Sequence, residues 1–189
     1  FTMANEQYRY LENQGGGNHL IIRNRVIPHV SWTVHETRLN EWYDGLDLEV
    51  RSRVRPVANN FPTDDVWIDD ILWEDDVRYW RPINLDDFPA IVNDETRVDT
   101  SGSPRAFSLS LADVTRLSGL GRAFSSMQDR RAFMDGEASG SSGFWWLRTP
   151  GEYGRAMWNT THSGVIASGR QVGSNVNWGG LRPALIVRQ

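Results

Sequence analysis

The chain has 189 residues and a formal net charge of −4, so we expect one domain without the basic surface that nucleic acid or anionic membranes require. It contains no Cys, and all 20 of its basic residues are Arg, which excludes disulfides, thiolate metal sites and lysine Schiff bases. Nine Trp are typical of a fold whose aromatic side chains serve both a core and a recognition surface.

The first third of the sequence predicts a hairpin. Residues 8–12 and 19–23 have strand-like patterns. The Gly- and Asn-rich residues 13–18 between them supply the turn, because Gly and Asn adopt positive φ at low cost.

Two helices follow in the prediction. Apolar residues recur at helical spacing over residues 33–44, with Thr33 or Thr37 as the N-cap and Gly45 as the stop. Asp47 is a candidate cap for a second short helix over 48–54, and both helices are interpreted as packing elements.

Residues 58–105 are interpreted as an irregular acidic insertion, because their apolar content is too low for a separate core. Within residues 64–76, acidic pairs alternate with apolar pairs. We favour a solvated loop anchored by Trp67 and Trp73. A calcium site remains the alternative, since hard oxygen ligands cluster here, although the Asp-x-Asp-x-Asp-Gly loop pattern is missing.

Regular structure is predicted again after residue 105. Residues 106–109 form a short strand, and Ser110 with Asp113 has the spacing of a capping box that begins a helix over 111–117. A further helix is expected over 126–134, with a serine at its start as the cap.

The last 46 residues have a β pattern throughout. Strands are expected over residues 144–148, 155–158, 164–167 and 182–188, with Ser168-Gly169 as a turn. Short helices in the first two thirds and an antiparallel meander at the C-terminus predict an α+β fold in one domain, residues 1–189.

Two sequence blocks near the C-terminus carry a resemblance. Phe144-Trp145-Trp146-Leu147-Arg148-Thr149-Pro150-Gly151 is followed about thirty residues later by Gly180-Leu181-Arg182-Pro183-Ala184-Leu185. This combination resembles the "WWLR-[ST]-PG … G-[VL]-RPAL" ending of a bacterial domain-of-unknown-function family. Earlier segments match it as well, with 58–105 the least similar part.

A more distant resemblance is to C-type-lectin-like and formylglycine-generating domains, in which a Trp-rich strand and a polar loop precede Gly-[hydrophobic]-Arg and a final strand. That superfamily includes the variable proteins of diversity-generating retroelements, whose ligand-binding residues lie near the C-terminus. The resemblance implies a C-type-lectin-like fold with a fixed sheet and variable exposed positions.

This sequence departs from those families at residues that two of their functions require. Formylglycine generation needs Cys, which this sequence does not contain. Calcium-dependent sugar binding uses an acidic residue after a Trp-Asn pair, whereas Trp158-Asn159 is followed by Thr160. No cofactor or metal is therefore expected.

No catalytic residue stands out. The four histidines have no ligand-like spacing, and there is no Gly-x-Ser-x-Gly nucleophile motif. A carboxylate pair from distant positions would escape detection, so an enzyme acting on cell-wall glycans is kept as a third hypothesis.

Trp145, Trp146 and Leu147 are expected to divide between the two faces of a strand, and Arg148 and Arg182 to brace backbone carbonyls. The candidate ligand-binding residues are instead the exposed-type aromatic, Arg and small polar residues of the late loops and strands. They are Tyr153, Arg155, Trp158, Asn159, Thr161, His162, Arg170, Gln171, Ser174, Asn175, Asn177 and Trp178.

The sequence thus favours a non-enzymatic ligand-binding or display domain of a bacterial surface or phage protein, with an extracellular, cell-surface or virion location. Its expected partner is a protein or glycan, without nucleic-acid binding or direct membrane insertion, and diversification by a retroelement is a further hypothesis. The alternative is a structural module of a surface or tail-fibre assembly, within a larger chain or complex.

Overall fold

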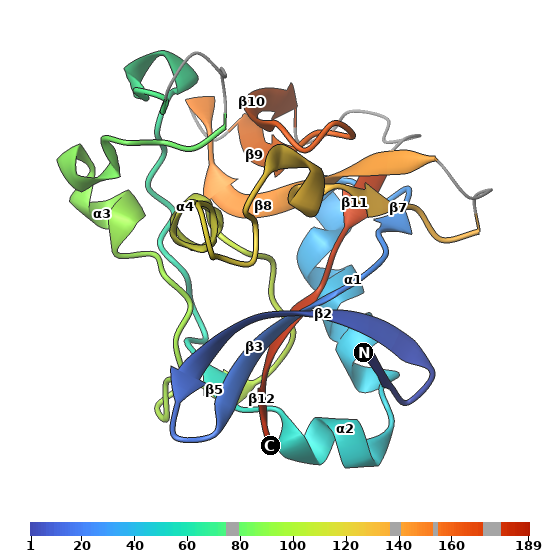
Figure 1. Ribbon diagram of the computed structural model, residues 1–189. Coiled ribbons are helices and arrows are strands. Elements are labelled where there is room, and N and C mark those ends of the chain that lie inside the picture. The colour runs from blue at the N-terminus through green and yellow to red at the C-terminus, as the bar shows by residue number, and fades with distance from the viewer. Residues whose placement is uncertain (75–79, 137–140, 153–154, 172–178) are drawn as a thin grey trace.

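The computed structural model describes residues 1–74, 80–136, 141–152, 155–171 and 179–189, with only the backbone of residues 170 and 171 (Figure 1). Helices and sheets are mixed along the chain, as the α+β expectation requires. Two main sheets occupy the lower and upper parts of Figure 1. In the described part of the chain, no helix has the length and apolar character to cross a membrane.

The lower sheet has the strand order β1-β2-β3-β12 and is antiparallel throughout. Its strands are β1 (Thr2–Met3), β2 (Glu6–Gly15), β3 (Asn18–Arg23) and β12 (Ala184–Arg188). The hairpin predicted from sequence is confirmed, and Gly15, Gly16 and Gly17 adopt positive φ around its turn. Because β12 pairs with β3 along its whole length, the end of the chain lies beside its beginning.

The upper sheet has the order β10-β9-β8-β11-β4, with β7 pairing to β8 as well. Its strands are β4 (Ile27–Pro28), β7 (Ala132–Phe133), β8 (Ser142–Pro150), β9 (Ala156–Thr160), β10 (Ile166–Gln171) and β11 (Gly179–Leu181). The meander β8-β9-β10 is antiparallel, as expected, but the closing strand expected over 182–188 is instead β12 of the lower sheet, where it pairs with β3.

Two features of the upper sheet correct the predicted C-terminal meander. Strand β11 runs parallel to β8 and fills the β8 edge that β9 leaves free. Ser168 and Gly169 do not end a strand. They lie within β10, where the register shifts between Ala167 and Arg170 and Gly169 has a φ of 90°, so an irregularity in the pairing takes the place of the expected turn.

The helices are short. They are η1 (Trp32–Val34), α1 (His35–Asp44), α2 (Leu48–Arg53), η2 (Ile68–Asp70), η3 (Leu85–Asp87), α3 (Pro89–Val92), α4 (Leu111–Leu117) and η4 (Met127–Arg130). The expected stop at Gly45 and start at Asp47 are confirmed. Neither Thr33 nor Thr37 caps α1, because the 3-10 turn η1 leads directly into it and Val34 occupies the N-cap.

Helix α4 begins with the predicted capping box, in which the Ser110 side chain accepts from the Asp113 backbone and the Asp113 side chain accepts from Ser110. The helix expected over 126–134 is wrong beyond Arg130. Strand β7 replaces its second half, since pairing with β8 satisfies that backbone. The strand expected over 106–109 is reduced to one bridge between Phe107 and Ala184.

The described residues of the segment 58–105, which exclude 75–79, contain few regular elements, as expected. The short strands β5 (Pro56–Val57) and β6 (Ser103–Pro104) pair at the two ends of this segment. Its apolar side chains nevertheless join the main core, where Val66, Ile71 and Ile91 are buried with residues of β3, α4 and β8. The segment therefore packs as part of the main body.

Strand β8 lies at the centre of the packing. Trp145 and Leu147 point into the largest buried cluster, while Phe144 and Trp146 pack with Met157 on the other face. The predicted division of these side chains between two faces is confirmed. A strand covered on both faces is held by packing as well as by its backbone hydrogen bonds.

Candidate binding surface and the frame beneath it

The two sequence blocks that carry the resemblance lie side by side in the structure. Gly179 and Gly180 of β11 pair with Phe144 and Trp145 of β8. The fully buried Arg182 guanidinium lies 5.1 Å from the Trp145 ring and donates to the Arg23 carbonyl at 2.9 Å. The expectation that Arg182 braces a backbone carbonyl is confirmed. Both blocks therefore belong to the internal frame of the molecule.

Three fully buried tryptophans tie this frame to distant segments. Each indole N–H donates to a backbone carbonyl: Trp145 to Arg130 at 2.9 Å, Trp146 to Val30 at 2.7 Å and Trp158 to Val66 at 3.0 Å. A buried indole whose N–H is hydrogen-bonded in this way contributes apolar packing and leaves no buried polar group without a partner.

Arg148 joins an ionic network that is almost entirely buried. Its Nη2 atom lies 2.7 Å from Asp94 Oδ1, and its Nη1 atom lies 3.1 Å from Asp113 Oδ2 and 2.8 Å from the Ser108 carbonyl. Thr96 completes the network by donating its hydroxyl to Asp113 at 2.7 Å. Arg148 thus braces backbone carbonyls, as predicted, but it also pairs with two buried carboxylates, and sequence reasoning did not predict this pairing.

The two carboxylates of this network differ in their pKa values. Burial raises the pKa of Asp94 to about 6, against the opposing attraction of Arg148. Burial also acts to raise the pKa of Asp113, but Arg148, Thr96 and Arg116 together bring it below the usual value. Because both groups are closed off from solvent, we interpret the network as structural.

The upper sheet carries an exposed loop, residues 161–165, between β9 and β10 (Figure 1). Three side chains hold its backbone: Arg130 donates to the Gly164 carbonyl at 2.7 Å, and Arg131 and Ser142 donate to the His162 carbonyl at 3.2 and 2.9 Å. A Cβ atom at Gly164 would lie 1.9 Å from the Met127 carbonyl oxygen. The loop is therefore fixed against η4 and the start of β8.

The side chains of this loop lie at the surface. His162 and Ser163 are exposed and Thr161 is half-buried. The hydroxyls of Thr161 and Ser163 lie 2.9 Å apart, and Thr161 Oγ1 also accepts the backbone N–H of Val165 at 3.2 Å. The loop thus presents His162 and two hydroxyls from a backbone with internal hydrogen bonds.

The candidate residues predicted from sequence divide into three groups. Arg155 and His162 are exposed and Thr161 is half-buried, as a binding surface requires. Trp158 and Asn159 are buried, which corrects their assignment to the surface. Of the others, Arg170 and Gln171 are described by backbone alone, and outside the described residues lie Tyr153, Ser174, Asn175, Asn177 and Trp178.

The burial of Trp158 follows from its place on β9. Its ring lies 6.2 Å from that of Trp73, which packs against the main core, and its indole is bonded to Val66. Because both partners come from the irregular segment 58–105, a pattern read within residues 153–178 could not reveal them. Sequence reasoning also missed Arg130, Arg131 and Ser142, for which no local pattern indicates a role in holding the loop.

The described residues contain no group of three or more His, Cys, Asp or Glu side chains that could hold a metal ion. Among the histidines, His35 is buried with its Nε2 atom 2.8 Å from Ser108 Oγ, and burial lowers its pKa to about 3. His35 is therefore neutral and part of the interior at physiological pH.

Comparison with known proteins gives one family match. The model of a domain of unknown function, DUF6273, matches residues 91–189, slightly more than half of the 189-residue chain. Neither the curated proteins nor the solved structures contain a match. The matched region holds both sequence blocks, the Arg148 network and the 161–165 loop. This chain belongs to the DUF6273 family.

Proposed function

We propose that this protein is a non-enzymatic ligand-binding domain of a bacterial surface or phage protein, which recognises a protein or glycan through Arg155 and the 161–165 loop. One observation carries the proposal: hydrogen bonds from Arg130, Arg131 and Ser142 hold the loop backbone, while the side chains of His162 and Ser163 face solvent.

A loop fixed in this way is suited to recognition. Ordering a mobile loop on binding costs free energy, and a loop that is already held avoids most of that cost. Arg, His, Thr and Ser side chains offer charged and neutral hydrogen-bonding groups of the kind found at protein and glycan contacts. Because the polar groups of the frame are engaged internally, changes in the exposed side chains leave the frame intact.

The C-type-lectin-like relationship is part of this proposal. It is supported by the Trp-rich strand β8, by the Gly-Leu-Arg sequence that leads into β12, and by the direct pairing of β8 with β11. Diversification by a retroelement extends it, and deep sequencing of the gene across a population tests that step. If the gene is diversified, changes should concentrate at adenines in codons 153–178. If these codons vary no more than the rest of the gene, retroelement diversification is rejected.

A glycan array and an array of bacterial surface proteins test the binding function, with the complete chain as the probe. We expect the double variant R155A/H162A to lose at least tenfold in signal on whichever array elements bind the wild type, with an unchanged Tm. Arg53→Ala is the matched control, because Arg53 is exposed on α2, at the opposite end of the molecule from β9 and β10 in Figure 1.

Three outcomes would reject the proposal. The wild type could bind nothing on either array, or the double variant could bind as the wild type does. The double variant could instead lose only its association with a neighbouring domain of the same assembly, which would favour the structural-module hypothesis.

A further inference from the structure

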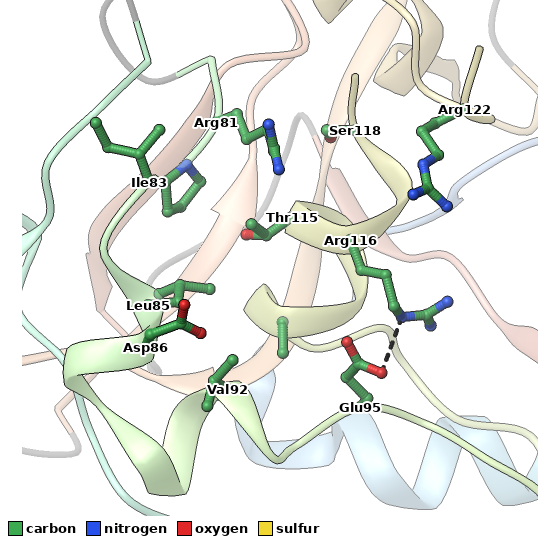
Figure 2. Close-up of a pocket in the computed structure, with 12 residues that line it drawn as sticks. Arg81, Ile83, Leu85, Asp86, Val92, Glu95, Thr115, Arg116, Ser118 and Arg122 are labelled. Atoms are coloured by element: carbon green, nitrogen blue, oxygen red, sulfur yellow. Dashed lines mark ion pairs between the residues drawn. The ribbon is translucent and has the colours of Figure 1, made fainter. Parts of the chain in front are cut away.

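A pocket of about 380 Å³ opens beside helix α4. Figure 2 shows its walls: the chain from Arg81 to Asp86, the segment from α3 to Glu95, and α4 with the turn that follows. Its volume lies within the range of roughly 300–1000 Å³ that small-molecule sites occupy. No residue of the predicted binding set lines it.

Part of the pocket wall is fixed by internal contacts. Arg116 forms ion pairs with Glu12, Glu95 and Asp113. Ser118 donates to the Val114 carbonyl at 2.7 Å and accepts from the buried Arg130 at 2.9 Å. These groups have their hydrogen-bond partners within the protein, so they give the pocket a defined shape.

Two other charged side chains on the lining are exposed at the surface. The side chains of Asp86 and Arg122 form no hydrogen bond or ion pair with any described residue, and they lie on opposite sides of the pocket in Figure 2. Between them, the Thr115 hydroxyl is buried without a hydrogen-bond partner. The pocket therefore offers a ligand an acceptor on Asp86 and a donor on Arg122, whereas the Thr115 hydroxyl is closed off from solvent.

The balance of charge argues against a free anion as the ligand. The lining has three guanidinium groups, but two of them are paired with carboxylates. Arg81 is paired with Glu74 at 3.2 Å, and Arg116 is paired with three carboxylates. Asp86 adds a further negative charge to the lining. A net positive field is what concentrates anions in a cleft, and this lining does not supply one.

The lining suits a ligand that donates hydrogen bonds on one side and accepts them on the other. The hydroxyl groups of a sugar ring do both, so they complement a carboxylate on one side and a guanidinium on the other. The buried Leu85 and the partly buried Val92 add apolar surface to the same pocket, against which the C–H face of a ring could pack.

We propose that this pocket binds one unit of a neutral saccharide, with Asp86 accepting and Arg122 donating hydrogen bonds to its hydroxyl groups. The site is separate from the 161–165 loop, because the two share no residue. Neither proposal depends on the other.

Saturation-transfer NMR and calorimetry on the complete chain test the proposal, with glucose, galactose, mannose and N-acetylglucosamine as the neutral probes. We expect at least one of them to bind at millimolar concentration. Asp86→Ala and Arg122→Ala should each weaken that binding at least tenfold. Asp87→Ala is the matched control, since Asp87 neighbours Asp86 but contacts Asn84 instead of lining the pocket.

Glucuronate and alanine serve as the anionic and zwitterionic probes. The proposal is overturned if no neutral sugar binds, if only glucuronate or alanine binds, or if sugar binding survives both pocket substitutions. The R155A/H162A variant should keep full sugar binding in this assay, so that failure of one proposal is distinguishable from failure of the other.

Discussion

At Arg148, one guanidinium holds together segments that are far apart in the sequence. It contacts the carboxylates of Asp94 and Asp113 and the Ser108 carbonyl, all in the interior. Breaking a buried ion pair is costly because the remaining charges stay desolvated. The planar geometry of Arg is also required here, since it serves several acceptors in different directions at once.

Arg148→Lys is therefore expected to lower the free energy of unfolding by about 3 kcal/mol, because a lysine cannot reach both carboxylates and the carbonyl together. Urea denaturation measures this change. Arg38→Lys is the control, since Arg38 forms an exposed pair with Glu41 and its replacement should change little. If Arg148→Lys and Arg38→Lys have the same free energy of unfolding, the buried network does not depend on the geometry of the guanidinium group.

His35 gives a prediction for pH. Its folded-state pKa is about 3 because of burial, against an ordinary value of 6.5. Between these values the unfolded chain binds a proton that the folded chain does not, so acidification lowers stability through His35. Asp94, whose pKa rises from 3.8 to about 6, has the opposite effect, because its folded form binds the extra proton.

Comparison with His35→Gln separates the two effects, since Asp94 is common to both proteins. The stability advantage of the wild type over His35→Gln, measured by urea denaturation, should be smaller at pH 5 than at pH 7. A constant difference across this range would mean that His35 titrates in the folded protein near its ordinary pKa.

Among the secondary-structure elements, β11 depends most on close backbone approach. A Cβ atom at Gly180 would lie 2.3 Å from the Ile27 carbonyl oxygen, and one at Gly179 would lie 2.4 Å from the Phe144 carbonyl oxygen. Strand β11 is thus held between β8 and β4 at a distance that only glycine permits.

Gly180→Ala is expected to destabilise the protein by about 2 kcal/mol or more, because the backbone must move to admit the methyl group. Thermal unfolding measures the effect. Gly45→Ala is the matched control, since Gly45 has a φ of −77° and an added Cβ would make ordinary contacts there. A Tm for Gly180→Ala equal to that of the control would contradict the close approach of β11 and β4.

At the scale of the whole molecule, the family match and the folded unit have different boundaries. The match begins at residue 91, yet β12 pairs with β3 and Arg182 donates to the Arg23 carbonyl. Leu185 and Leu181 are also buried in a cluster with Leu39 of α1. The matched part therefore depends on the N-terminal part for one sheet edge and for much of its burial.

A fragment of residues 91–189 should accordingly show no cooperative unfolding transition by circular dichroism, because β12 would leave its backbone groups unpaired and its apolar face exposed. Addition of a fragment of residues 1–90 should restore part of the native signal. The reverse finding, a cooperative transition in the isolated 91–189 fragment, would show that the N-terminal part is dispensable for folding.

The sequence by itself determined the features that depend on near neighbours. The first hairpin follows from Gly and Asn at its turn, the end of α1 from Gly45, and the start of α4 from Ser110 and Asp113. In each case residues within a few positions satisfy the backbone. Local pattern also predicted the strand β8 and the placement of its tryptophans on two faces.

The tertiary structure alone decided what depends on distant partners. The parallel pairing of β11 with β8, the burial of Trp158 under the 58–105 segment and the Arg148 network each join residues tens of positions apart. Part of the helix expected over 126–134 became β7, because pairing with β8 overrode local propensity. Similarly, the loop 161–165 is fixed against the rest of the molecule by donors on Arg130, Arg131 and Ser142, which come from distant positions in the sequence.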